Sequence, residues 1–214
     1  TAANTAAPTI LRSQYCLYCM ALASPPSKES WRAQFRAARA SFSPQQYAAR
    51  SALIGQRALA TRAVTTAAVV HVYWPLLNQR EPDTRALISA LRALGKEVVL
   101  PVVDAFPPAA PALSHRLYTG PQTLVSNKWG IPEPTGTPEV APDALDVVLV
   151  PALGADSRGQ RLGQGGGYYD AFLQDLSCPR LALVYADCVV PRLPCDPHDV
   201  PATALVTGQT VLSL

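Results

Sequence analysis

The chain has 214 residues, 49% of them hydrophobic and 15% charged, and a formal net charge of +3. This composition predicts one packed domain and excludes an intrinsically disordered chain. So small a charge gives no reason to expect a nucleic acid or an anionic membrane as partner. No apolar run reaches the roughly 18–20 residues of a membrane-spanning helix. We also expect the protein to be a monomer.

The first 26 residues are expected to form a tail, disordered or loosely packed, outside a single domain that spans residues 27–214. The tail holds Cys16 and Cys19 at a spacing used by metal and redox sites, but no second cysteine pair or nearby histidine follows. Five cysteines cannot all pair, so reduced thiols in a cytoplasmic protein are the favoured interpretation. A secretion signal is less favoured, because the segment has one basic residue and a short, broken apolar core.

Two helices are predicted at the start of the domain. The first has an apolar stripe at helical spacing: Trp31, Phe35, Ala38 and Phe42. The same helix has basic residues spaced by four, four and three: Lys28, Arg32, Arg36 and Arg39. This spacing predicts one basic edge. The sequence Ser43-Pro44-Gln45-Gln46 then predicts a capping box that opens a second helix, which runs to about Arg62.

Strands and helices alternate in the rest of the chain. Short Val-rich and Leu-rich runs predict buried strands at 67–73, 97–103, 147–150, 181–185 and 204–207, with another near 116–118. Helices are expected at 82–95 and 168–176. The alternation predicts an α/β fold, a three-layer sandwich around a mainly parallel sheet with the N-terminal helices packed on it.

A glycine-rich segment between a predicted strand and a predicted helix carries the clearest chemistry. It contains Gly163, Gly165, Gly166 and Gly167, where the missing Cβ atoms allow the backbone to approach a ligand closely. Successive N–H groups and the start of the helix favour an anion, and Arg161 adds a full positive charge. The segment matches neither the P-loop nor the dinucleotide-binding motif. It predicts a phosphate-binding loop, and a flexible surface loop is the alternative.

The run Arg161-Leu162-Gly163-x-Gly165-x-Gly167-Tyr168-Tyr169-Asp170 resembles the signature of the 5-formyltetrahydrofolate cyclo-ligase family, also called 5,10-methenyltetrahydrofolate synthetases. Other segments resemble the family in the same order along the chain. They are Lys28-x-x-Trp31-Arg32 followed by Arg39, Glu81-x-Asp83-Thr84, Trp129-Gly130-Ile131-Pro132-Glu133-Pro134, and Leu193-Pro194 with His198-Asp199-Val200. The chain departs from the family at Ala155, where a phenylalanine usually precedes the aspartate.

The resemblance implies an ATP-dependent ligase. ATP would phosphorylate the formyl oxygen of 5-formyltetrahydrofolate, and N10 would then close the ring to give 5,10-methenyltetrahydrofolate, ADP and phosphate. Phosphoryl transfer requires mainly positioning and charge stabilisation from the protein. This requirement agrees with a sequence in which no Ser–His or Cys–His nucleophile pair is evident.

The resemblance also implies a role for individual residues. The residues implied to bind ATP are Lys28, Arg32, Arg161, Leu162, Gly163, Gln164, Gly165, Gly166, Gly167, Tyr168 and Tyr169. The catalytic residues would be Lys28, Arg161 and Asp170. The folate substrate would contact Leu76, Glu81, Trp129 and Tyr168. The cofactor Mg²⁺ would be held by Asp170 and Asp199, since carboxylates are ligands that Mg²⁺ prefers.

Each assignment has a simpler alternative. The basic residues of the first helix can form a solvated edge, Asp170 and Glu81 can be carboxylates stabilised at helix starts, and Leu76 can be a core residue. The whole chain can also be another phosphate-handling enzyme of similar architecture, such as a sugar-phosphate isomerase or a CoA-transferase-like protein. A third possibility is a non-enzymatic module that binds a nucleotide or a folate.

Overall fold

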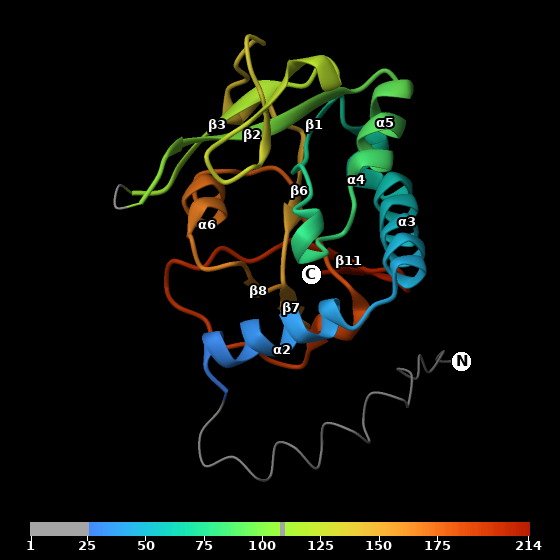
Figure 1. The fold of residues 1–214 in the computed structure, drawn as a ribbon, viewed down its shortest axis with the longest axis vertical. Coiled ribbons are helices and arrows are strands. Elements are labelled where there is room, and N and C mark those ends of the chain that lie inside the picture. The colour runs from blue at the N-terminus through green and yellow to red at the C-terminus, as the bar shows by residue number, and fades with distance from the viewer. Residues whose placement is uncertain (1–25, 108–109) are drawn as a thin grey trace, which may run out of the picture.

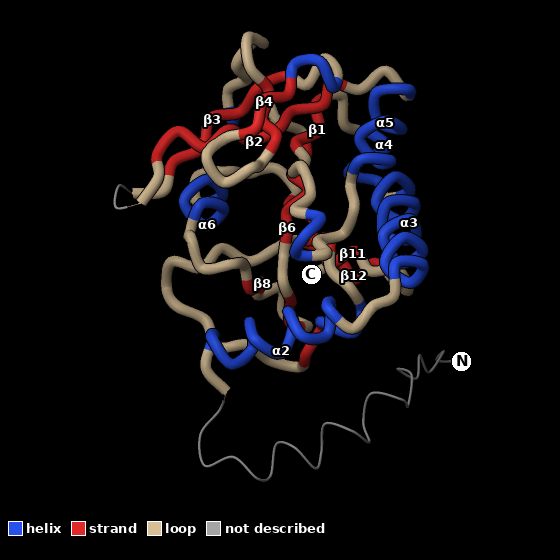
Figure 2. The backbone as a smooth tube through the Cα atoms, in the orientation of Figure 1, coloured by secondary structure: helices blue, strands red, loops and turns tan. Residues whose placement is uncertain are grey.

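The computed structural model describes residues 26–107 and 110–214, so almost all of the predicted tail lies outside the described residues, Cys16 and Cys19 included. A seven-stranded sheet forms the centre of the domain (Figures 1 and 2). In spatial order its strands are β12 (Val211–Ser213), β11 (Ala204–Val206), β9 (Arg180–Leu183), β6 (Val147–Pro151), β1 (Val69–His71), β2 (Glu97–Ala105) and β3 (Ala112–Leu117).

The five inner strands of the sheet are parallel. β11 pairs with β9, β9 with β6, β6 with β1 and β1 with β2, all in parallel register. The edge strands β12 and β3 are antiparallel to their neighbours. The predicted mainly parallel sheet is therefore confirmed, and β12 is an edge strand that the sequence did not predict.

Helices cover both faces of this sheet (Figure 1). One face carries α3 (Pro44–Ala60), α4 (Arg62–Thr66) and α5 (Arg85–Ala93), and the other carries α6 (Tyr168–Leu173). Alternate residues of β6 belong to two different cores, with Val147 and Leu149 in the larger one and Val148 in the smaller one beside Leu173 of α6. A strand buried on both faces reads as a continuous apolar run, which explains the Val-rich sequence.

The first helix, α2 (Lys28–Ala40), closes the carboxyl end of the central strands instead of covering a face (Figure 1). Its Phe35 packs against Gly154, just beyond the end of β6. Arg39 is 1% exposed and donates to the carbonyl oxygen of Ala152. Arg39 is therefore buried, and the alternative of a solvated basic edge is wrong for this residue. The basic edge of α2 is partly exposed at Lys28, but three turns later, at Arg39, it is buried in the protein interior.

The other predicted helix ends are close to the observed ones. Ser43 and Gln46 form the expected capping box. The second helix ends at Ala60 because Thr61 adopts an extended conformation, and its hydroxyl then caps α4. The helix predicted at 168–176 ends earlier, at Leu173. No helix in the described ranges is both long and apolar enough to cross a membrane.

Several short elements were not predicted, because two or three residues carry too little periodicity. A three-stranded sheet contains β10 (Val189–Val190), β7 (Gly154–Asp156) and β8 (Arg161–Leu162), and a hairpin joins β4 (Leu124–Ser126) to β5 (Pro132–Pro134). The 3₁₀ helices are η2 (Leu77–Gln79), η3 (Pro121–Thr123), η4 (Pro142–Ala144) and η5 (Ala186–Cys188). The two small sheets hold the loops that border the site described below.

We predict that Gly154→Ala destabilises the domain, because its new Cβ would overlap the ring of Phe35. Overpacking of this kind costs about 1–3 kcal/mol. Each kcal/mol lowers the melting temperature of a domain of this size by about 2–4 °C. Gly163→Ala is the matched control in a thermal melt, since no heavy atom lies within 4 Å of its added Cβ. Equal melting temperatures for the two variants would contradict the close fit of α2.

Candidate active site

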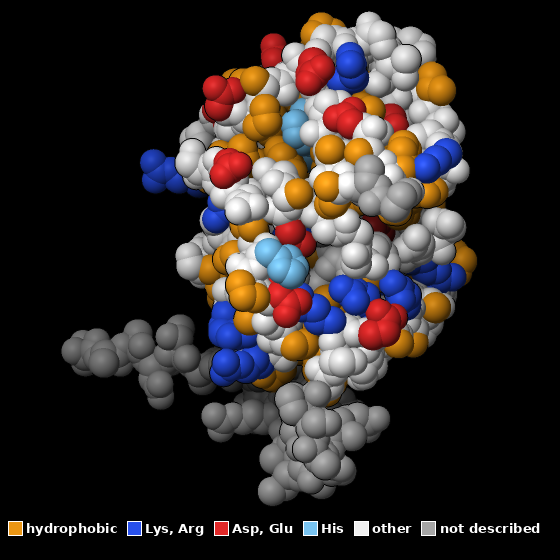
Figure 3. Space-filling view, turned by 90° about the vertical axis from the view of Figure 1, so that its left-hand side faces the viewer, with side chains coloured by type: hydrophobic (Ala, Val, Ile, Leu, Met, Phe, Trp, Pro, Cys, Tyr) orange, Lys and Arg blue, Asp and Glu red, His pale blue; other side chains and the backbone are white. Residues whose placement is uncertain are grey.

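A cavity of about 670 Å³ opens at the carboxyl ends of β1, β2 and β6. In the sheet, β1 and β6 are neighbours. The strands that follow β1 lie towards one edge of the sheet, and those that follow β6 lie towards the other edge, so the order of strands reverses between them. Ligands of open α/β sheets bind at such a switch point. Basic side chains gather in the lower half of the molecular face shown in Figure 3, towards α2.

The glycine-rich loop forms one wall of this cavity. Asp156 of β7 anchors the segment before it, because its buried carboxylate accepts hydrogen bonds from the backbone N–H groups of Arg158, Gln160 and Leu193. Gly165 and Gly167 have φ angles of +105° and +73°, which a side chain would strain. Glycine is therefore favoured at these two positions by the backbone conformation itself.

Positive side chains from α2 and β8 meet at this wall. The Nε of Arg32 donates to the carbonyl oxygen of Gly163 at 3.1 Å. The Nζ of Lys28 lies 2.5 Å from Asp199 and 2.7 Å from Asp196. Burial lowers the pKa of Lys28, but hydrogen bonds to these two carboxylates outweigh it and the net shift is upward. Lys28 and Arg32 of α2 are therefore both held at the cavity wall.

Arg161 is the buried cation of the site. Its Nη2 lies 2.8 Å from Oδ1 of Asp170, and its Nε has no hydrogen-bond partner among the described residues. Burial lowers the pKa of Arg161, and the charge of Asp170 opposes this shift. A buried guanidinium with an unused donor beside a glycine-rich loop is suited to binding a phosphate oxygen.

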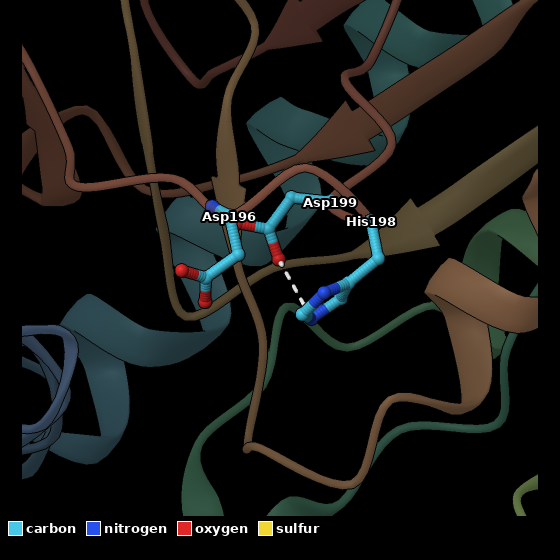
Figure 4. Close-up of side chains that lie close together, drawn as sticks. All are labelled: Asp196, His198 and Asp199. Carbon is cyan, nitrogen blue, oxygen red and sulfur yellow. Dashed lines mark hydrogen bonds and ion pairs between the residues drawn. The ribbon is translucent and has the colours of Figure 1, made fainter.

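The two carboxylates predicted to bind metal, Asp170 and Asp199, both line the cavity. The N–H of Val200 donates to Oδ1 of Asp170, which brings the residue after Asp199 against α6. The structure adds Asp196 and His198, whose ligand atoms lie within 4.8 Å of one of Asp199 (Figure 4). Sequence analysis missed both because they follow no fixed ligand spacing. The only signal was the Asp-Pro-His-Asp run itself.

This donor set fits Mg²⁺. Oδ1 of Asp170 and Oδ2 of Asp199 accept hydrogen bonds, whereas Oδ2 of Asp170 and Oδ1 of Asp199 accept none from the described residues. Each carboxylate therefore has one oxygen available. Mg²⁺ prefers one or two such hard oxygens together with substrate phosphates.

Another carboxylate of the cavity, Glu81, lies near Gln164 of the glycine-rich loop and the guanidinium of Arg39. It is 7% exposed, and its Oε2 accepts a hydrogen bond from the N–H of Leu76 at 2.9 Å. Burial raises the pKa of Glu81, although that hydrogen bond and the charge of Arg39 oppose the shift. Because α5 begins only at Arg85, Glu81 is not a carboxylate of the first helical turn.

Aromatic side chains complete this part of the cavity. The ring of Trp129, 47% exposed, makes edge contacts with Phe106 and Tyr168 at centroid distances of 4.5 and 5.9 Å. The hydroxyl group of Tyr169 is buried without a hydrogen-bond partner among the described residues, and burial and the nearby charge of Glu81 raise its pKa. Trp129 thus belongs to the cavity wall and not to the core.

All the residues predicted for the site line this one cavity, although they come from separate parts of the chain. They are Lys28, Arg32, Leu76, Glu81, Trp129, Arg161, Leu162, Gly163, Gln164, Gly165, Gly166, Gly167, Tyr168, Tyr169, Asp170 and Asp199. The cavity wall also includes a carboxylate that sequence analysis did not single out, Glu133. Its buried position between two strands has no signal in the sequence.

Residues 24–208 match the 5-formyltetrahydrofolate cyclo-ligase family, and the chain belongs to that family. A relative, the 5-formyltetrahydrofolate cyclo-ligase of Escherichia coli (strain K12), is 40% identical over 166 residues, which cover 74% of this chain and 90% of that protein. The enzyme of the same name from Mycolicibacterium smegmatis is 36% identical over 131 residues, 59% of this chain and 68% of that protein.

A solved structure agrees with the fold. The NMR structure of 5,10-methenyltetrahydrofolate synthetase from Aquifex aeolicus has a TM-score of 0.77 and 27% identity to this chain. The superposition covers 87% of this chain and 92% of that chain. The resemblance stated from the glycine-rich segment is therefore confirmed, and so is the α/β fold.

Proposed function

We propose that this protein converts 5-formyltetrahydrofolate to 5,10-methenyltetrahydrofolate and hydrolyses ATP to ADP and phosphate in the process. The observation that carries the proposal is the convergence of the predicted ATP, folate and metal residues on one cavity. Relatives in E. coli and M. smegmatis bear the name of this activity. We also propose that the protein is a monomer and acts in the cytoplasm.

The basic part of the cavity is the proposed ATP site. Lys28, Arg32 and Arg161 would neutralise the phosphates, and the N–H groups of the loop from Gly163 to Gly167 would donate to their oxygens. Asp170 and Asp199 would hold Mg²⁺, which supplies charge stabilisation to the phosphates when bound. Lys28 and Arg161 are the cations that we assign to the charge developing on the transferred phosphoryl group.

The remaining part is the proposed folate site. Glu81 would accept hydrogen bonds from the N–H edge of the pterin, and Leu76, Trp129 and Tyr168 would pack against its ring system. A buried carboxylate that already accepts one N–H group is well placed to accept others from the neutral pterin ring. The formyl oxygen would then point towards the basic part of the cavity.

The buried hydroxyl group of Tyr169 supports this placement of the two substrates. The charges of Glu81 and of Arg161 both act on its pKa, so Tyr169 lies near the carboxylate proposed to bind the pterin and near the cation proposed to bind phosphate. Phosphoryl transfer to the formyl oxygen would occur in this region. N10 would then attack the formyl carbon, and phosphate would leave as the ring closes.

The other enzymatic interpretation requires a free base at the loop. Asp170 is the carboxylate next to the glycine-rich loop, and its Oδ1 is engaged by Arg161 and by the N–H of Val200. This contact favours the ligase over a sugar-phosphate isomerase.

The direct test mixes the protein with 5-formyltetrahydrofolate and Mg-ATP and follows the near-ultraviolet absorbance of the methenyl product. We expect product formation that depends on ATP and matches the release of phosphate. A reaction without protein controls for ring closure driven by acid. Product at the same rate without ATP, or no product at all, would contradict the proposed function.

Asp170→Asn should slow turnover at saturating ATP by about 10²-fold or more, the usual scale for loss of one preorganised charge near a reacting group. We expect the variant to need more Mg²⁺, because asparagine keeps the shape of the ligand without its charge. The measurement is turnover against Mg²⁺ concentration, with the exposed Asp175→Asn as control. A lower melting temperature with an unchanged Mg²⁺ response would show that Asp170 serves only its ion pair with Arg161.

The affinity for 5-formyltetrahydrofolate should fall as the pH is lowered. Burial raises the pKa of Glu81, so this carboxyl group takes up its proton at a higher pH than an exposed glutamate does. The ionised form accepts the pterin hydrogen bonds, and binding is therefore strongest above the pKa and is lost below it. Hydrogen bonds to charged groups contribute about 1.5–3 kcal/mol, or about tenfold to hundredfold in affinity.

Calorimetry without ATP measures this binding across the pH range. The matched variant Glu81→Gln should bind more weakly and show a flatter pH dependence. If Glu81→Gln keeps the wild-type pH dependence, another group is responsible for it and the assignment of Glu81 to the pterin is wrong.

A further inference from the structure

The loop that carries Trp129 is tied to β2 through a buried side-chain contact. Glu133 of β5 is 8% exposed, and its Oε1 accepts hydrogen bonds from the N–H of Val103 at 3.0 Å and from Nδ2 of Asn127 at 2.7 Å. The other end of the Asn127 side chain, Oδ1, accepts from the N–H groups of Trp129 and Ile131 at 2.8 and 3.1 Å. Glu133 thus connects the tip of the loop to the central sheet.

A second set of contacts returns from the loop to the same stretch of β2. The ring of Trp129 contacts Phe106 and Tyr168, and the hydroxyl group of Tyr168 donates to the carbonyl oxygen of Ala105 at 2.8 Å. The register of β2 shifts between Val103 and Ala105, where both sets of contacts attach. The aromatic wall of the cavity is therefore held from two sides at one irregular point of a strand.

We propose that Glu133 and Asn127 are positioning residues that hold Trp129 and Tyr168 in the shape that receives the folate rings. This inference rests on the proposed function and adds two residues to it. Neither side chain needs to touch the reacting atoms. Their contribution is preorganisation, since a wall already ordered before binding costs the ligand less conformational entropy.

The contacts of Glu133 are not needed to close the hairpin itself. Three backbone pairs already join β4 to β5, from Leu124 with Pro134 to Ser126 with Pro132. Beyond them lies Gly130, whose φ of +74° marks a turn that a side chain would strain. Loss of the Glu133 side chain would therefore release the tip of the loop from β2 while the hairpin persists.

A specific feature of the geometry makes this role testable. Both donors use the same oxygen of Glu133, Oε1. A glutamine side chain retains one such oxygen, so Glu133→Gln can accept both hydrogen bonds, whereas Glu133→Ala accepts neither. A base or a charged ligand to the substrate would instead require the carboxylate itself. The pair of variants separates the two roles.

The experiment compares steady-state kinetics of Glu133→Ala, Glu133→Gln and Asn127→Ala. We expect the KM for 5-formyltetrahydrofolate to rise at least about tenfold in both alanine variants, with kcat and the KM for ATP within about twofold of wild type. Glu133→Gln should behave as wild type. The exposed Glu139→Ala, a carboxylate 3.7 Å from Arg116, is the matched control. Amide hydrogen exchange should be faster at residues 127–131 in the alanine variants.

Two results would overturn the inference. A large loss of kcat in Glu133→Gln would show that the carboxylate takes part in the chemistry. Faster exchange in Glu133→Ala with an unchanged KM for the folate would show that the ordered loop serves no substrate. If wild-type protein lacks the activity, the proposed function fails in the first assay, and calorimetric binding of 5-formyltetrahydrofolate to the same variants then decides the role of the loop separately.

Discussion

The packing of α2 across the carboxyl end of β6 is the contact on which the site depends. Phe35 fills the space left by Gly154, and the buried guanidinium of Arg39 donates to the carbonyl oxygen of Ala152 and lies over the ring of Tyr185. Nε and Nη1 of Arg39 have no partner among the described residues, so this burial is costly. The direction of α2 is fixed by the packing of Phe35 and by the contacts that Arg39 does make.

This packing places the first two turns of α2 at the cavity. Arg32 reaches the carbonyl oxygen of Gly163, and Lys28 reaches Asp199 on a distant segment of the chain. The glycine-rich loop is held in turn by the short pairing of β7 with β8 and by the buried carboxylate of Asp156. The short strands and loops therefore determine the shape of the site, whereas the parallel sheet determines where in the fold the site lies.

The sequence was informative where a pattern is local and was silent where a contact is distant. The inner strands and the long helices follow from hydrophobic periodicity, and the glycine-rich loop follows from its spacing between a strand and a helix. The burial of Arg39 could not be predicted in this way. Helical spacing places Arg39 on the same edge as Lys28, and only the packing of that edge against the end of β6 determines which part of it is buried. The link from Glu133 to Val103 joins residues thirty positions apart and leaves no periodic trace.

The ion pairs of the cavity explain how one site can bind both phosphates and a metal ion. Lys28 is paired with Asp199, and Arg161 with Asp170, before any substrate is present. Under the proposed function, the phosphates take the two cations as partners and Mg²⁺ takes the two carboxylates, so each charge exchanges one partner for another. The charges are held in place in advance, and little reorganisation accompanies binding.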